Sequence, residues 1–185
     1  MKVHALLLLA LTLAWPCSAA ATDYSVRPEL SRLAFHGTYQ GATFNGRFKQ
    51  WTADISYDPA DLAHSKFDVV VTLASAGTGD HDQDNALPGP SFFDVLNHPT
   101  AHFVSTGFHH EGNLVIADGQ LTLRGVTRPV SLGVVFRQQS AHSATLDVAG
   151  HLKRLDFGVG SGEYADTSVI GDVVRITAHL QLAAK

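Results

Sequence analysis

The 185-residue sequence contains one cysteine and few charged residues, and both shortages exclude classes of protein. A single cysteine, Cys17, cannot build a disulfide framework within the chain or a cysteine-based zinc site. Charged residues make up 16% of the chain, against roughly a quarter in an average domain. Hydrophobic residues make up 45%, which predicts a folded domain rather than a disordered chain. The formal net charge of −4 argues against a nucleic-acid-binding protein, which would present a basic face.

The familiar catalytic signatures are missing as well. The glycine-rich segment 158–162 comes nearest to the Gly-x-Ser-x-Gly nucleophile elbow, but its spacing is wrong, and we interpret it as a bend. The acidic run 80–84 lacks the glycine and the glutamate of a calcium-binding loop, since Asn85 and Ser91 stand at those positions. The residues therefore indicate no catalytic constellation.

The histidines leave one alternative open, a histidine-based metal-binding protein. His98 and His102 are four residues apart, but Pro99 between them disfavours a helix that would bring them to one face. His109 and His110 are adjacent, so in a strand they point to opposite faces. We expect the histidines to face solvent from the polar faces of strands and to bind no metal.

The first residues have the pattern of a signal peptide. A short positive head precedes a run from Ala5 to Trp15 that is apolar apart from Thr12, and small residues follow at 18–21. A membrane-spanning helix needs about 20 apolar residues, so this run is too short to be one. We predict that residues 1–21 are a signal peptide, removed on export, and that residues 22–185 form one domain.

Most of the mature chain alternates apolar and polar residues with period two, which predicts strands. Turn signals separate the runs, with hairpin tips expected at 111–113 and 124–126. Alternation fails only near 80–97, where a short helical or irregular insert is expected. About eight strands of this kind predict an all-β fold, an antiparallel barrel or a sandwich. The alternating runs lie near residues 33–39, 44–48, 67–73, 130–136, 146–152 and 174–182.

Aromatic residues gather on the apolar faces of these runs. They indicate either a filled core or an apolar cavity, because an eight-stranded barrel is just wide enough to hold one small ligand. From the residues alone both interpretations stay open. The candidate ligand-binding residues are Phe35, Tyr39, Phe44, Phe48, Trp51, Phe67, Val69, Val71, Phe92, Phe93, Phe103 and Phe136.

Several motifs resemble the YceI family of periplasmic, lipocalin-like proteins that bind polyisoprenoids and other long-chain lipids. The most specific is Gly119-Gln-Leu-Thr-Leu-Arg-Gly-Val-Thr-Arg-Pro-Val130, which is similar to the family's hairpin. Phe92-Phe93-Asp94, the segment Pro99–Thr106, the segment 152–160 and Gly46-Arg47-Phe48 add to the likeness. One departure is the stretch Ala86-Leu87-Pro88, where many members carry His-Leu-Arg.

The resemblance implies a long antiparallel lipocalin-like barrel of about eight strands with an elongated apolar cavity. It also implies a periplasmic location, no enzymatic activity and no cofactor other than a bound isoprenoid or fatty-acid-like lipid. The expected function is therefore a periplasmic carrier for a long-chain isoprenoid such as a ubiquinone or a polyprenyl lipid. We further expect Phe92 or Phe93 to close the cavity entrance, because adjacent apolar residues in a connection are costly to expose.

The segment Gly160–Thr167 is similar to a subgroup of the family associated with cytochrome b561 partners. A second hypothesis is therefore an accessory protein that docks on a membrane b-type cytochrome. No nucleic-acid partner is expected, and a homodimer is left open.

Overall fold

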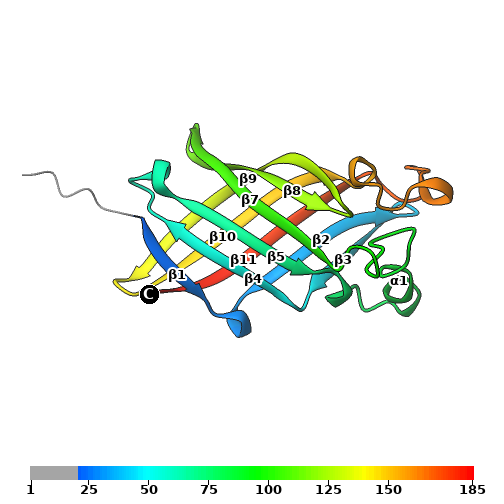
Figure 1. The fold of residues 1–185 in the computed structure, drawn as a ribbon, viewed down its shortest axis with the longest axis horizontal. Coiled ribbons are helices and arrows are strands. Elements are labelled where there is room, and N and C mark those ends of the chain that lie inside the picture. The colour runs from blue at the N-terminus through cyan, green and yellow to red at the C-terminus, as the bar shows by residue number, and fades with distance from the viewer. Residues whose placement is uncertain (1–20) are drawn as a thin grey trace, which may run out of the picture.

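A computed structural model describes residues 21–185, in which an antiparallel sheet closes into a barrel (Figure 1). Closure follows from β1, which pairs with β4 on one side and with β11 on the other. The predicted signal peptide lies outside the described residues, apart from Ala21. The strands that follow one another around the closed ring are β1 (Thr22–Val26), β4 (Trp51–Tyr57), β5 (Lys66–Thr72), β7 (Thr100–Glu111), β8 (Leu114–Leu123), β9 (Val126–Ser140), β10 (Ser143–Lys153) and β11 (Val173–Ala184).

Three further strands extend the wall of the barrel toward one end. β2 (Arg32–Tyr39) follows β1 after the 3₁₀ turn η1 (Pro28–Leu30) and also pairs with β11. β3 (Ala42–Phe48) pairs with β2 and runs on into β4. β6 (Ala76–Gly77) follows β5 after η3 (Leu73–Ser75) and pairs with β3. The predicted all-β barrel of about eight strands is thus confirmed. Three of its strands are interrupted, and each consists of two segments: β1 and β2, β3 and β4, and β5 and β6.

Tight hairpins set the register between the long strands. The turn from β8 to β9 has positive φ at Arg124 (52°) and Gly125 (73°), and the turn from β2 to β3 has it at Gln40 (50°) and Gly41 (79°). Two consecutive residues with positive φ are the mark of the hairpin turns whose twist matches that of the flanking strands. Since side chains alternate along each strand, this register places one apolar set inside the barrel.

The connections concentrate at one end of the barrel, which we call the loop end (Figure 1). The insert, residues 80–99, starts with α1 (His81–Ala86), capped by the Asp80 carboxylate, which accepts hydrogen bonds from the backbone N–H groups of Asp82 and Gln83. The closing loop, residues 154–172, contains η4 (Arg154–Phe157) and η5 (Gly162–Tyr164). The turn η2 (Leu62–His64), between β4 and β5, lies at the opposite end, where Leu62 packs against the core group that contains Tyr57. Within residues 21–185, no helix has the length and apolar character of a membrane span.

The interior has two groups of buried side chains. One lies at the end that carries β1 and the C-terminus (Figure 1), and Tyr57, Leu146 and Leu182 are its largest fully buried side chains. Burial raises the pKa of the Tyr57 hydroxyl, and the negative charge of Asp58 raises it further. The other group lies under the loops and includes Phe93 and Phe157. The two groups differ in how completely they fill the barrel.

A buried cation organises the closing loop. Arg154 is 3% exposed, and burial lowers the pKa of its guanidinium, an effect that the Asp172 carboxylate opposes. A guanidinium has five N–H donors, and here each finds a carbonyl. At 2.6–3.1 Å, the acceptors are the backbone oxygens of Val159, Gly160, Tyr164, Ile170 and Gly171.

Replacing Arg154 by Met keeps the aliphatic stem and removes all five donors. We expect the free energy of unfolding to fall by about 3 kcal/mol or more, because each buried carbonyl left without a donor costs about 1–3 kcal/mol. Urea unfolding followed by circular dichroism measures the loss. Lys153→Met, at the exposed neighbouring position, should stay within about 0.5 kcal/mol of the native protein. A loss in Arg154→Met no larger than in this control would contradict the structural role of Arg154.

Candidate functional site

An apolar cavity of about 230 Å³ lies inside the barrel toward the loop end. Its wall is built from the inner faces of β2, β3, β4, β5, β7, β8, β9, β10 and β11, and η3, the insert and the closing loop contribute the remainder. Arg154 is the only polar residue among those that line it, and its donors are all engaged by backbone carbonyls. The cavity therefore offers a ligand contact with hydrocarbon and no free hydrogen-bonding group.

Aromatic rings form much of this wall because they lie over glycines on neighbouring strands. Phe35 is paired across β2 and β3 with Gly46, and a Cβ at Gly46 would overlap the Phe35 ring. Phe44 is paired with Gly37, where a Cβ would lie 2.6 Å from the ring. The ring of Phe103 covers Gly119 in the same way. Each ring thus rests against the sheet, and the centre of the barrel stays open.

Phe92 and Phe93 occupy the loop end of the cavity. Phe93 is buried, with its ring centroid 6.5 Å from that of Phe35 and 6.1 Å from that of Phe48. Phe92 is half-buried and packs on Tyr164 of the closing loop, with centroids 5.0 Å apart. Both rings line the cavity, so the insert provides its cover.

The cover is tied to its surroundings by polar contacts. The Arg124 guanidinium, at the β8–β9 turn, donates to the backbone oxygens of Pro90 and Phe92. The backbone N–H of Gly160 donates to the oxygen of Ser91 at 2.7 Å, which joins the closing loop to the insert. Both connections meet the insert around its two phenylalanines.

The structure brings ten of the twelve sequence-derived candidates together on the cavity wall, and two lie elsewhere. Tyr39 is 42% exposed at the last position of β2, beside the hairpin turn. Phe136 points inward but packs against Tyr24 and Tyr57, away from the cavity. The ten lining residues are Phe35, Phe44, Phe48, Trp51, Phe67, Val69, Val71, Phe92, Phe93 and Phe103.

Sequence reasoning missed several aliphatic residues of the wall and one cation. Leu33, Ile176 and Leu180 line the cavity, and each stands on the apolar face of a run that the period-two pattern had already indicated. Leu87, from the insert, had no such signal because alternation fails there. Arg154 had no signal from period or polarity, since a charged residue is not expected inside a barrel, and only its place in the segment 152–160 that resembles the family pointed to it.

The histidines that form ion pairs do so on the outside of the barrel. His102 contacts Asp68 at 2.7 Å, and His109 contacts Asp118 at 2.9 Å. The hydrogen bond from His179, with a further one from Arg137, lowers the pKa of Asp147. Among residues 21–185, no three His, Cys, Asp or Glu side chains are close enough to share a metal ion.

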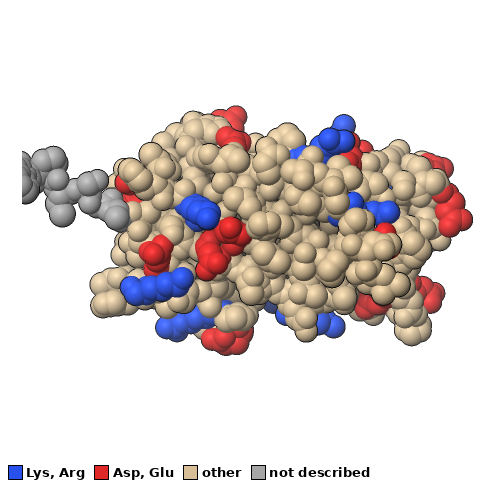
Figure 2. Space-filling model, in the orientation of Figure 1, with Lys and Arg blue, Asp and Glu red and all other residues tan. Residues whose placement is uncertain are grey.

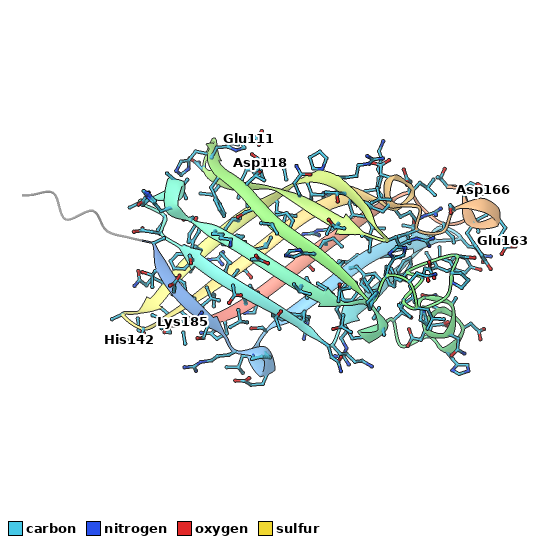
Figure 3. The ribbon with its side chains drawn as sticks, in the orientation of Figure 1. Glu111, Asp118, His142, Glu163, Asp166 and Lys185 are labelled. Atoms are coloured by element: carbon cyan, nitrogen blue, oxygen red, sulfur yellow. The ribbon has the colours of Figure 1, made fainter. Side chains whose placement is uncertain are left out.

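The surface around the loop end is acidic. Figure 3 shows Glu163 and Asp166 at the tip of the closing loop, and Figure 2 shows acidic side chains along that end of the molecule. Hydrogen bonds from the backbone and hydroxyl of Thr78 lower the pKa of Asp84 in α1, and those from Ser168 lower the pKa of Asp166. These carboxylates therefore stay ionised to lower pH than isolated ones.

The sequence of this barrel matches known proteins. The model of the YceI-like domain matches residues 24–182. The chain belongs to the YceI family. A UPF0312 protein of Pseudomonas syringae pv. tomato is 31% identical over 159 residues, which cover 80% of this chain and 83% of that protein. A UPF0312 protein of Vibrio vulnificus is 33% identical over 132 residues, 69% of this chain and 70% of the relative.

Solved structures share the fold. BcnA of Burkholderia cenocepacia superposes with a TM-score of 0.80 at 31% identity, covering 85% of this chain and 99% of that chain. A polyisoprenoid binding domain from Saccharophagus degradans superposes with a TM-score of 0.70 at 16% identity, covering 89% and 99%. The second likeness, at this identity, concerns the fold alone.

The glycine–phenylalanine pairs give a direct test of how the cavity is kept open. In Gly46→Ala the new methyl group must displace the Phe35 ring toward the lumen, so we expect a hydrophobic fluorescent probe to bind about tenfold more weakly, which corresponds to about 1.4 kcal/mol. Probe titration measures the change. In the control Gly107→Ala, nothing lies within 4 Å of the added Cβ, and affinity should be unchanged. Equal affinities of the two variants would contradict this account.

Proposed function

We propose that this protein binds a long-chain isoprenoid lipid of the ubiquinone or polyprenyl type in its barrel cavity and carries it in the periplasm. The observation that carries the proposal is the cavity itself, which is lined by hydrocarbon except for a guanidinium with no free donor. Burial contributes about 0.8 kcal/mol for each methylene group. A chain of several isoprene units therefore offers more than about 10 kcal/mol before association costs of about 4–15 kcal/mol.

The chemistry of the lining also favours an uncharged ligand. An ionised carboxylate in such a cavity would lose its hydration and gain no hydrogen bond, which is strongly unfavourable. Arg154 cannot compensate, because its five N–H groups are held by the closing loop. The acidic residues at the loop end, Glu163 and Asp166 among them, would repel an anionic headgroup at the entrance. A neutral isoprenoid fits these conditions better than a fatty acid.

The likeness to known proteins also supports an isoprenoid ligand. The Saccharophagus degradans structure is described as a polyisoprenoid binding domain, and it has the same barrel. Extension of that ligand class to this chain rests on the apolar cavity.

A second candidate function is docking on a membrane b-type cytochrome, and exposed apolar residues at the loop end favour it. Leu96 in the insert is 94% exposed, and Val169 and Tyr164 in the closing loop are 40% and 37% exposed. These side chains surround the end where a ligand would enter. Docking there would bring the cavity to the partner, so this function is compatible with lipid transfer.

The first function predicts co-purified lipid. Solvent extraction of periplasmic protein followed by mass spectrometry should yield about one neutral isoprenoid per molecule. Phe92→Ala/Phe93→Ala should reduce the lipid retained per folded molecule, because both rings cover the cavity. Phe108→Ala/Phe136→Ala, which removes two rings that do not line the cavity, should retain it. An unchanged ratio in the first variant would exclude the covering role of these phenylalanines, and a protein free of isoprenoid would contradict the proposed ligand.

The second function predicts loss of docking without loss of lipid. Leu96→Asp/Val169→Asp places two charges at the exposed loop end, and we expect it to abolish co-purification with a b-type cytochrome. Leu114→Asp is the matched control, since Leu114 is 39% exposed and stands at the β7–β8 hairpin, opposite Glu111. Cytochrome binding that survives in the double variant would refute docking at this end.

A further inference from the structure

The half of the barrel away from the loops is plugged by a cluster of aromatic rings. Five strands each contribute one, and neighbouring ring centroids are 4.8–6.0 Å apart. Contacts of this kind are typical of well-packed aromatic cores. The members of this ring cluster are Tyr24, Tyr57, Phe67, Phe108 and Phe136.

The cavity ends where this cluster begins. Along β4, Trp51, Ala53 and Ile55 line the cavity and the next inward residue, Tyr57, does not. The same boundary occurs along β5 at Phe67, which is the cross-strand partner of Ile55. The last cavity-lining residues of β4 and β5 are therefore directly paired across the two strands.

Strands β10 and β11 have their boundary in a second cross-strand pair. Leu146 of β10 lines the cavity and Ala144 does not, while Leu180 of β11 lines it and Leu182 does not. Leu146 and Leu180 are partners in the β10–β11 register. All four residues of the two pairs are buried, at 4% exposure or less. We call Ile55, Phe67, Leu146 and Leu180 the floor.

We infer that the floor sets the length of isoprenoid chain that this protein buries, an inference that rests on the proposed function. The cavity volume of about 230 Å³ holds roughly 15–23 water-sized spheres. With about one sphere for each of the five carbon atoms of an isoprene unit, this corresponds to roughly three to five units. Because the rings behind the floor are closely packed, a longer chain cannot extend past it. Its additional units remain at the loop end in contact with water and add no burial.

The inference predicts a break in the dependence of affinity on chain length. Neutral prenols of graded length serve as probes, and quenching of the cavity residue Trp51 reports binding. Affinity should rise at least tenfold with each isoprene unit up to the break and level off beyond it.

Substitutions in the floor should move that break in opposite directions. Phe67→Ala removes a ring from the floor and should shift the break up by about one unit. Phe67→Leu, which preserves more of the packing, should shift it in the same direction by less, and it keeps the test valid if Phe67→Ala does not fold. Leu180→Phe adds a ring at the floor and shortens the cavity, so it should shift the break down by about one unit. Phe108→Ala is the control, because it removes a ring of the cluster that does not line the cavity and is not the cross-strand partner of a floor residue, so it should leave the break in place.

The outcomes separate this inference from the proposed function. A native protein that binds no prenol of any length overturns both. Prenol binding with a break that stays fixed in Phe67→Ala, Phe67→Leu and Leu180→Phe overturns the role of the floor and leaves the proposed function standing. A shift in Phe108→Ala as large as that in Phe67→Ala also overturns it, because general loosening of the ring cluster would then explain both.

Discussion

The lumen of an eight-stranded barrel is just wide enough for side chains to fill, so this barrel is hollow only where its rings are held against the wall. Glycines on the inner face of the sheet allow the rings to lie against the wall. Gly37, Gly46 and Gly119 each leave space for a phenylalanine ring from a neighbouring strand. In the other half, rings from five strands pack on one another and fill the lumen, as Tyr57 does on Phe67. The position of a few inward-facing glycines therefore separates a binding cavity from a solid core.

Two arginines hold the segments that cover the cavity, Arg154 the closing loop and Arg124 the insert. Arg154 is buried and holds the closing loop by five bonds to carbonyls, so the loop and the barrel rim form one unit. Arg124 is half-buried and holds the insert by bonds to two carbonyls. Local opening is easiest where few buried contacts must be broken. The insert, with Phe92 and Phe93, is therefore the part of the cover that opens at lower cost.

The alternation of apolar and polar residues was enough to predict the all-β barrel, the irregular insert and the inward face of most strands. It was not enough to predict depth along the barrel axis, because depth depends on strand tilt and stagger, which bring distant residues to one level. Phe136 has the correct inward phase and yet belongs to the ring cluster, and Tyr39 lies at a hairpin beyond the cavity. Arg154 could not be placed from period or polarity, because its burial requires five carbonyls supplied by a loop with no regular pattern.

The two ends of the barrel are thus chemically unequal, and under the proposed function this inequality would give lipid exchange a direction. The ring cluster blocks the end that carries β1 and the C-terminus (Figure 1), so in the proposed function a lipid chain would enter and leave past the insert. An apolar chain that leaves by this route exposes its surface to water before it reaches an acceptor, at about 0.8 kcal/mol for each methylene group. An acceptor that covers the exposed Leu96 and Val169 removes water from the same place. Contact at the loop end would therefore lower the barrier to release most for the ligand with the longest buried chain.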